Sequence, residues 1–311
     1  MDKKFFLNRK NESNECVMPL IVGMPITTRC NLSCEHCLRN NNKIIANYIW
    51  DMSIEEAKVL ASKFKGKCKF VNLSAGYGEP FLNKNINYIF EVFRQENLAT
   101  IIYTNGKLLN KTILSGFFSD YFIISIDLFH YKNIYDLLSR FKDLVTLADD
   151  LNYIFTNKFI ISCVIDSNIE NYELVKSLCE LQITHPKIFI EFHWRMIYND
   201  KPSVVNKIDM GYLELENKYR SSHIEFPTFM HYQNNHCSDL WKSAYFDHNG
   251  NFRGCCVFYD TYRALNIFKM SLEDIWTSDV LNYLRNRWRE CDGFEKCKQC
   301  PIGYGNVNEW R

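Results

Sequence analysis

Short apolar runs alternate with amphipathic stretches along the first two thirds of the chain. Six runs have the length and the β-branched content of buried strands, at residues 19–28, 69–74, 99–103, 121–126, 159–165 and 187–192. The intervening patterns predict helices over residues 85–95 and 134–147, and one that opens at Ser53 with Glu56 completing a capping box. Strands separated by helices predict right-handed βαβ crossovers and a parallel sheet. The fold class is therefore α/β, and six such units suit a partial (β/α)6 barrel that is open on one side.

The pattern changes after residue 195. Residues 196–236 are irregular and polar, with one helical stretch at 212–219, and are interpreted as a bridging region. The C-terminal part, residues 237–311, predicts a β-hairpin over 244–253 with an Asn-Gly turn, followed by two helical stretches at 271–276 and 280–288. Residues 1–18 are a polar N-terminal tail. We therefore expect a barrel over residues 19–195 and a small C-terminal domain.

Composition excludes several classes of protein. The chain has 311 residues and a net charge of +1 without a basic block, so nothing indicates nucleic-acid binding. No run approaches the roughly 20 apolar residues of a membrane span, and the apolar part of the N-terminus is too short for a signal peptide. Thirteen cysteines without a secretory signal indicate a cytoplasmic protein whose cysteines bind metal instead of forming disulfides.

Three of these cysteines lie close together after the first apolar run, in the spacing Cys30-x3-Cys34-x2-Cys37. Three thiolates on one tight loop can bind three irons of a 4Fe–4S cluster and leave the fourth iron without a protein ligand. Iron–sulfur sites are normally closed by four thiolates, so the open iron implies another ligand. A structural zinc or an inert cysteine cluster is the alternative, although zinc sites favour paired Cys-x2-Cys knuckles with four ligands.

This motif resembles that of the radical S-adenosylmethionine (radical SAM) superfamily. There the amino and carboxylate groups of the methionine moiety chelate the open iron. The segment Ala75-Gly76-Tyr77-Gly78-Glu79-Pro80 follows the second predicted strand and is similar to the Gly-Gly-Glu-Pro element of that family. Glycines such as Gly76 and Gly78 let a backbone approach a ligand closely. The resemblance implies that backbone groups around Gly78 and Glu79 hold the methionine ammonium, whereas an ordinary turn is the alternative.

Other candidate residues follow the remaining strands, because parallel α/β folds place ligands at the carboxyl ends of their strands. The resemblance implies that polar side chains at these ends reach the cofactor's carboxylate and ribose, the candidates being Asn105, Ser125, Asp127 and Asn168. It also implies that His36 lies beside the adenine. All of these residues could instead serve as loop or helix-cap residues. Arg195, at the end of the sixth strand, could hold an anionic group of the substrate or pair with a surface carboxylate.

The C-terminal cysteines form a second set. The predicted hairpin is bracketed by Cys237 and Cys255, and a Cys-x2-Cys pair follows near the end of the chain. This pattern resembles the twitch form of the SPASM extension of radical SAM enzymes. It implies one auxiliary 4Fe–4S cluster, hence two clusters in all besides S-adenosylmethionine, with the ligands Cys237, Cys255, Cys297 and Cys300. A zinc knuckle would use the same four residues.

The resemblance implies that reductive cleavage of S-adenosylmethionine yields a 5′-deoxyadenosyl radical, which abstracts a hydrogen atom from the substrate. A low-potential electron donor of the flavodoxin or ferredoxin kind is then required. About 18 residues precede the first strand, which favours a small metabolite or a short peptide over a substrate recruited by a fused leader-binding domain. We expect an oxidation with the auxiliary cluster as electron acceptor.

Two alternatives remain open. One is a peptide-modifying enzyme that epimerises or crosslinks its substrate, with Cys256 as a hydrogen-atom donor beside the ligand Cys255. The other belongs to a different class, an iron–sulfur electron-transfer protein or a zinc-stabilised binding module.

Overall fold

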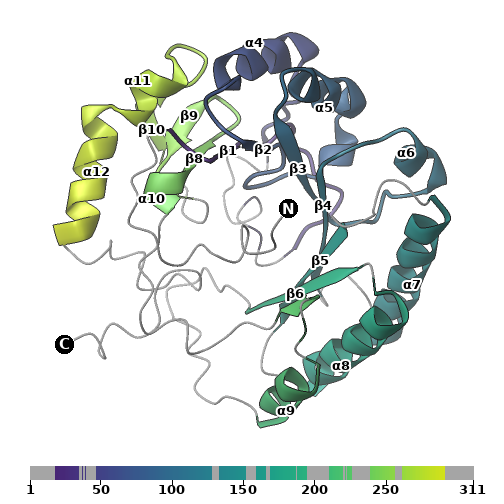
Figure 1. Ribbon diagram of the computed structural model, residues 1–311. Coiled ribbons are helices and arrows are strands. Elements are labelled where there is room, and N and C mark those ends of the chain that lie inside the picture. The colour runs from purple at the N-terminus through teal and green to yellow at the C-terminus, as the bar shows by residue number, and fades with distance from the viewer. Residues whose placement is uncertain are drawn as a thin grey trace. The chain divides into compact units, whose positions relative to one another are not determined.

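The computed structural model describes residues 18–34, 37, 39, 47–127, 133–151, 159–165, 169–186, 188–194, 210–219, 221, 223–225, 239–255 and 261–290 (Figure 1). The chain divides into two compact units. One consists of Met1–Arg29, Asn47–Thr100 and Thr228–Arg311, and the other of Cys30–Ala46 and Ile101–Pro227. Each unit is therefore assembled from segments far apart in sequence.

The first unit contains a mixed sheet with the strand order β10-β9-β8-β1-β2. The strands are β1 (Ile21–Gly23), β2 (Phe70–Asn72), β8 (Ser243–Phe246), β9 (Asn251–Arg253) and β10 (Thr261–Asn266). Strand β1 pairs in parallel with both β2 and β8, whereas β8, β9 and β10 pair antiparallel. The C-terminal hairpin thus continues the sheet that the N-terminal strands begin.

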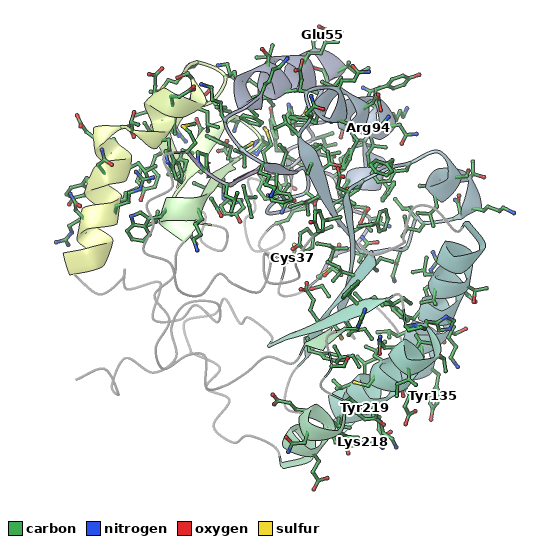
Figure 2. All side chains as sticks on the ribbon, viewed as in Figure 1. Cys37, Glu55, Arg94, Tyr135, Lys218 and Tyr219 are labelled. Atoms are coloured by element: carbon green, nitrogen blue, oxygen red, sulfur yellow. The ribbon has the colours of Figure 1, made fainter. Side chains whose placement is uncertain are left out.

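The helices of this unit are α4 (Ile54–Phe64), η1 (Pro80–Leu82), α5 (Ile86–Gln95), α10 (Asp239–Lys242), α11 (Leu272–Trp276) and α12 (Asp279–Glu290). Figure 1 shows α4 and α5 side by side, and the rings of Phe64 and Phe93 stack between them with centroids 6.2 Å apart. Their charged side chains, such as Glu55 and Arg94, lie on the opposite, exposed side (Figure 2). Apolar residues at helical spacing therefore bury one side of each helix.

The second unit has five parallel strands in the order β3-β4-β5-β6-β7. These are β3 (Ala99–Thr104), whose first two residues belong to the first unit, β4 (Tyr121–Asp127), β5 (Phe159–Ile165), β6 (Phe189–Trp194) and β7 (Ile224–Glu225). The helices α6 (Lys111–Ser115), α7 (Ile134–Leu151), α8 (Ile169–Thr184) and α9 (Met210–Tyr219) connect them. Figure 1 shows α7, α8 and α9 together on one side of these strands.

The α/β fold class with parallel strands, predicted from the sequence, is confirmed. All six predicted strands form, as β1 to β6, and the predicted capping box of α4 is present, with Ser53 Oγ accepting from the Glu56 amide at 3.1 Å. The strand predicted over residues 19–28 is shorter than expected. After Gly23 the chain forms only isolated bridges, such as that between Thr27 and Asp51.

The predicted hairpin also forms. The turn Asp247–Gly250 places Gly250 at φ +79°, where a side chain would be strained, and the Gly250 amide donates to the Asp247 carbonyl at 3.0 Å. This is a type I turn followed by a left-handed glycine, one of the common hairpin connections. The domain boundaries drawn from the sequence remain predictions. None of the helices in the described ranges has the length and hydropathy needed to cross a bilayer.

Candidate functional site

We define the cysteine segment as Cys30–Ala46. The residues just before it and just after it in the chain, Thr28 on one side and Tyr48 and Trp50 on the other, form hydrogen bonds with each other. The Thr28 amide donates to the Trp50 carbonyl at 2.9 Å, and the Trp50 amide donates back to Thr28 Oγ1 at 2.8 Å. Thr28 Oγ1 in turn donates to the Tyr48 carbonyl at 2.6 Å. Thr28, Tyr48 and Trp50 all lie in the first unit, so these bonds join two parts of that unit that are about twenty residues apart in the chain.

Arg29, the residue before the first cysteine of the segment, is held by Asp51. Its Nε lies 3.1 Å from Asp51 Oδ1, and its Nη2 lies 2.5 Å from Oδ2, a bidentate ion pair. The same Nη2 donates to the Leu82 carbonyl in η1, and Thr27 Oγ1 donates to Asp51 Oδ1 at 2.5 Å. This network fixes the direction in which the chain enters the cysteine segment.

The glycine loop, which we define as Gly76–Glu79, contacts the backbone of Thr27 and Arg29, just before the cysteine segment. Gly78 has φ +91°, and a Cβ on it would lie 2.1 Å from the carbonyl oxygen of Thr27. The Glu79 amide donates to the Arg29 carbonyl at 2.7 Å. Only glycine fits at position 78, because both its φ and its contact with the Thr27 backbone exclude a side chain. The glycine loop is therefore bonded to the residue that precedes Cys30.

Two buried side chains support the glycine loop. The Glu79 side chain, in a residue only 1% exposed, accepts from the Phe81 amide at 3.3 Å and caps η1. The Asn83 amide, also in a residue 1% exposed, donates to the carbonyls of Ile26 at 2.8 Å and Met52 at 3.0 Å. The role assigned to the backbone of Gly78 and Glu79 remains a prediction. The Glu79 side chain caps the turn that follows the loop, and Asn83 ties the end of that turn to the backbone of Ile26 and Met52.

The three predicted cluster ligands lie on one segment. Cys30, Cys34 and Cys37 are half-buried, and none is in a disulfide. The Cys37 amide donates to the Cys34 carbonyl at 3.1 Å, and Figure 2 labels Cys37. Within the described ranges, no three His, Cys, Asp or Glu side chains are arranged as the ligands of one metal ion. The donor set nevertheless has the chemistry that iron requires, three thiols outside disulfides. The assignment of these residues as ligands remains a prediction.

The strand ends of the second unit carry the other candidates. Asn105 follows β3, and its Nδ2 lies 2.8 Å from Asn31 Oδ1, so it contacts the residue after Cys30. Its Oδ1 accepts from the Lys107 amide at 3.0 Å. Ser125 is half-buried in β4 and pairs in register with Ser162 of β5, and Asp127 is the last residue of β4. Asn105 is thus a predicted cofactor-binding residue that lies beside the cysteine segment.

Several predicted site residues lie outside the described ranges, namely His36, Asn168, Arg195, Cys237, Cys256, Cys297 and Cys300. The predicted auxiliary ligand Cys255 is described. It is half-buried, follows β9 closely, and is not in a disulfide. Both the auxiliary ligand set and the roles of these residues therefore stay predictions.

One pair of residues at this loop was not predicted from the sequence. Tyr77, in the glycine loop, places its hydroxyl 2.5 Å from Nδ1 of His248 in the hairpin turn. Both residues are buried, and burial lowers the pKa of His248, while the neighbouring Asp247 carboxylate opposes that shift. A tyrosine between two glycines was the only signal in the sequence, and nothing there indicated its partner.

Two family models match the chain. One, described as the radical SAM superfamily, matches residues 24–178. The other, SPASM, described as an iron-sulfur cluster-binding domain, matches residues 237–301. The two matches agree with the two cysteine sets singled out in the sequence.

Two curated proteins are similar to the chain. AlbA, an antilisterial bacteriocin subtilosin biosynthesis protein of Bacillus subtilis, is 23% identical over 292 residues, which cover 88% of this chain and 62% of AlbA. The Fe-coproporphyrin III synthase of Methanosarcina barkeri is 31% identical over 91 residues, 29% of this chain and 22% of that protein. The chain spans less than two thirds of the length of either relative.

Solved structures share the fold. SuiB of Streptococcus suis bound to its precursor peptide SuiA has a TM-score of 0.60 at 18% identity, over 93% of this chain and 71% of SuiB. SuiB bound to S-adenosylmethionine has a TM-score of 0.59 at 17% identity, over 92% and 69% of the two chains. Native anSMEcpe with bound AdoMet has a TM-score of 0.61 at 15% identity, over 91% of this chain and 89% of anSMEcpe. At these identities the likeness shows the fold alone.

Proposed function

Because the chain belongs to the radical SAM superfamily and carries a SPASM iron–sulfur domain, we propose that it modifies a peptide after reductive cleavage of S-adenosylmethionine. The superfamily implies a 4Fe–4S cluster and S-adenosylmethionine, and the SPASM domain implies further iron–sulfur clusters. When bound, these groups supply the 5′-deoxyadenosyl radical that removes a hydrogen atom from the substrate. The protein's part is to bind and orient them.

The observation that carries this proposal is the path of the glycine loop. Gly78 passes so close to Thr27 that no side chain fits, and the Glu79 amide is bonded to Arg29, next to Cys30 in the chain. A backbone held in this way presents its own polar groups at the entry to the cysteine segment. This supports main-chain recognition of the methionine ammonium, as the resemblance implies.

The remaining residues are assigned complementary roles. Cys30, Cys34 and Cys37 hold three irons of the first cluster, and the side chains at the strand ends bind the cofactor's carboxylate and ribose, namely Asn105, Ser125, Asp127 and Asn168. His36 lies beside the adenine, and Arg195 orients an anionic group of the substrate. An auxiliary cluster is held by Cys237, Cys255, Cys297 and Cys300.

Two comparisons favour a peptide over a small metabolite. SuiB, which shares the fold, binds the precursor peptide SuiA, and AlbA takes part in bacteriocin biosynthesis. We therefore propose a peptide substrate, a low-potential flavodoxin- or ferredoxin-like electron donor, and a cytoplasmic location.

The net reaction we propose is an oxidation. The substrate loses a hydrogen atom to the 5′-deoxyadenosyl radical, then an electron to the SPASM iron–sulfur domain and a proton to a base. The product therefore has two hydrogen atoms fewer than the substrate. The second candidate is hydrogen-atom return from Cys256, favoured by its place beside Cys255 in the sequence, which leaves the substrate mass unchanged.

The experiment is anaerobic. The reconstituted full chain is incubated with S-adenosylmethionine and dithionite, and 5′-deoxyadenosine is measured by chromatography and mass spectrometry. Formation of 5′-deoxyadenosine is expected, and its absence in protein loaded with clusters contradicts the proposal. With a peptide that is modified, the reaction in deuterated water separates the two outcomes, since hydrogen-atom return through the Cys256 thiol adds one non-exchangeable deuterium.

A further inference from the structure

The pair Tyr77 and His248 joins the glycine loop to the C-terminal hairpin turn within the first unit. The Tyr77 hydroxyl lies 2.5 Å from His248 Nδ1, and the His248 backbone N–H donates to the same oxygen at 3.1 Å. Tyr77 is 5% exposed and His248 is 8% exposed. Two buried hydrogen bonds therefore join residues that are 171 positions apart in the sequence.

The His248 ring has a polar partner at each of its nitrogens. The Tyr77 hydroxyl, which accepts from the His248 backbone N–H, also shares a hydrogen with Nδ1, since a hydroxyl can both donate and accept. The other ring nitrogen, Nε2, lies 3.1 Å from Nδ2 of Asn249. Burial lowers the pKa of His248, in agreement with a neutral ring. The pair is therefore a buried link in which both ring nitrogens of His248 have polar partners.

The His248 ring also packs on the segment that follows the cysteine segment. Its centroid lies 4.9 Å from that of Tyr48 and 6.1 Å from that of Trp50. These are the residues whose backbones bond to Thr28 on the other side of the cysteine segment. The hairpin turn thus contacts both the glycine loop and the residues Tyr48 and Trp50, which follow the cysteine segment in the chain.

Tyr77 is the only side chain in the tripeptide Gly76-Tyr77-Gly78. The two glycines have φ +103° and +91°, and glycine loses more conformational freedom on folding than any other residue. A loop of this kind has little preference for one conformation unless an outside contact selects it. The bonds to His248 provide one such contact, and the bond of the Glu79 amide to the Arg29 carbonyl provides another.

We propose that Tyr77 and His248 are positioning residues for S-adenosylmethionine, through which the hairpin turn holds the glycine loop in its binding conformation. This inference rests on the proposed function, because it takes the glycine loop as part of the cofactor site. It assigns the C-terminal region a role in cofactor binding that is separate from cluster ligation.

The test uses the reconstituted full chain and uncoupled formation of 5′-deoxyadenosine with dithionite. Tyr77→Phe removes one buried hydroxyl and keeps the ring. We expect the KM for S-adenosylmethionine to rise about fivefold, the effect of one lost hydrogen bond, with kcat and iron content unchanged. The matched control is Tyr88→Phe on α5, which removes an exposed hydroxyl from the same unit and should leave KM unchanged.

A second set of variants addresses the histidine. His248→Asn places an amide oxygen where Nδ1 was and should retain most of the affinity, whereas His248→Leu should raise KM as Tyr77→Phe does. If the two residues act through their mutual bond, the double variant Tyr77→Phe with His248→Leu costs no more than either single change.

The outcomes separate this inference from the proposed function. If the wild-type protein forms no 5′-deoxyadenosine although its clusters are loaded, the proposed function fails. If the wild-type protein is active but Tyr77→Phe and His248→Leu keep its KM, or if their effects simply add, the positioning role is wrong while the proposed function stands. A fall in kcat or iron content without a change in KM contradicts the positioning role in the same way.

Discussion

The glycine loop of the first unit and the strand ends of the second unit carry different kinds of candidate cofactor-binding group. The glycine loop offers main chain, and the side chains that support it, Glu79 and Asn83, are 1% exposed. The strand ends offer short side chains, such as Asn105 and Ser125, which are half-buried. Main-chain recognition depends on the path of the chain and therefore on distant contacts, whereas side-chain recognition depends on single residues.

The largest effect is expected from the cysteine segment. Changing Cys30, Cys34 and Cys37 together to Ala should abolish 5′-deoxyadenosine formation. It should also remove about half of the bound iron, because the two proposed clusters are both of the 4Fe–4S type and one of them is lost. Iron analysis and the dithionite assay measure both. The control is Cys68→Ala, since burial raises the pKa of the Cys68 thiol to about 12 and makes it a poor ligand. Cofactor cleavage retained by the triple variant would sink the assignment.

The next largest effect is expected on stability, when Asn83, which bonds just after the glycine loop, is changed. Asn83→Ala removes two buried hydrogen bonds, to the carbonyls of Ile26 and Met52, of which the Ile26 carbonyl keeps its bond from the Met52 amide, so the free energy of unfolding should fall by about 1–3 kcal/mol. Denaturant unfolding measures this. Asn85→Ala, two residues further on, where the side chain makes no capping bond, should stay within about 0.5 kcal/mol of the wild type. Equal losses in both variants would mean that Asn83 does not hold the loop.

A smaller effect is expected at the strand ends. Asn105→Ala should raise the KM for S-adenosylmethionine about fivefold, as the loss of one hydrogen bond to the cofactor. Asn31→Ala removes only the side chain that Asn105 contacts at 2.8 Å, and should change KM less. If the two variants have the same KM, Asn105 acts through Asn31 and not on the cofactor.

The smallest effect concerns pH. Burial lowers the pKa of His248 below its ordinary value of about 6.5, so the unfolded chain binds a proton more readily than the folded one. This contribution to stability is complete above pH 6.5 or so and is lost as the pH falls through that value. Thermal unfolding of the wild type and of His248→Asn between pH 5 and 8 or so measures it. An identical pH dependence in both proteins would show that His248 is not buried as a neutral ring.

The sequence predicted those parts of the molecule that local patterns determine. The strands β1 to β6, the capping box at Ser53 and the hairpin turn each depend on a few neighbouring residues, and each is present. The parallel pairing of β8 with β1 was not predicted, because a choice of strand partner so distant in sequence leaves no local pattern. The contact of Tyr77 with His248 was not predicted for the same reason.

The candidate site divides in the same way. The Cys30, Cys34 and Cys37 spacing and the glycine element could be recognised because they are contiguous motifs. The hydrogen bonds that hold these motifs in place could not be predicted from the sequence. The bonds of Arg29 to Asp51 and of Asn83 to Ile26 join residues that are ordinary in sequence and acquire a role only when the chain folds.

The central claim is that the main chain of the glycine loop binds S-adenosylmethionine, and its most direct test compares two glycines with positive φ. Gly78 has φ +91° and leaves a Cβ 2.1 Å from the Thr27 carbonyl oxygen, whereas Gly66 has φ +68° and nothing within 4 Å of a Cβ. The affinity of the reconstituted protein for S-adenosylmethionine is measured by calorimetry for Gly78→Ala and Gly66→Ala. The account predicts at least about a tenfold loss for Gly78→Ala, as the clash displaces the loop, and wild-type affinity for Gly66→Ala. Wild-type affinity in a folded, cluster-loaded Gly78→Ala protein would contradict it.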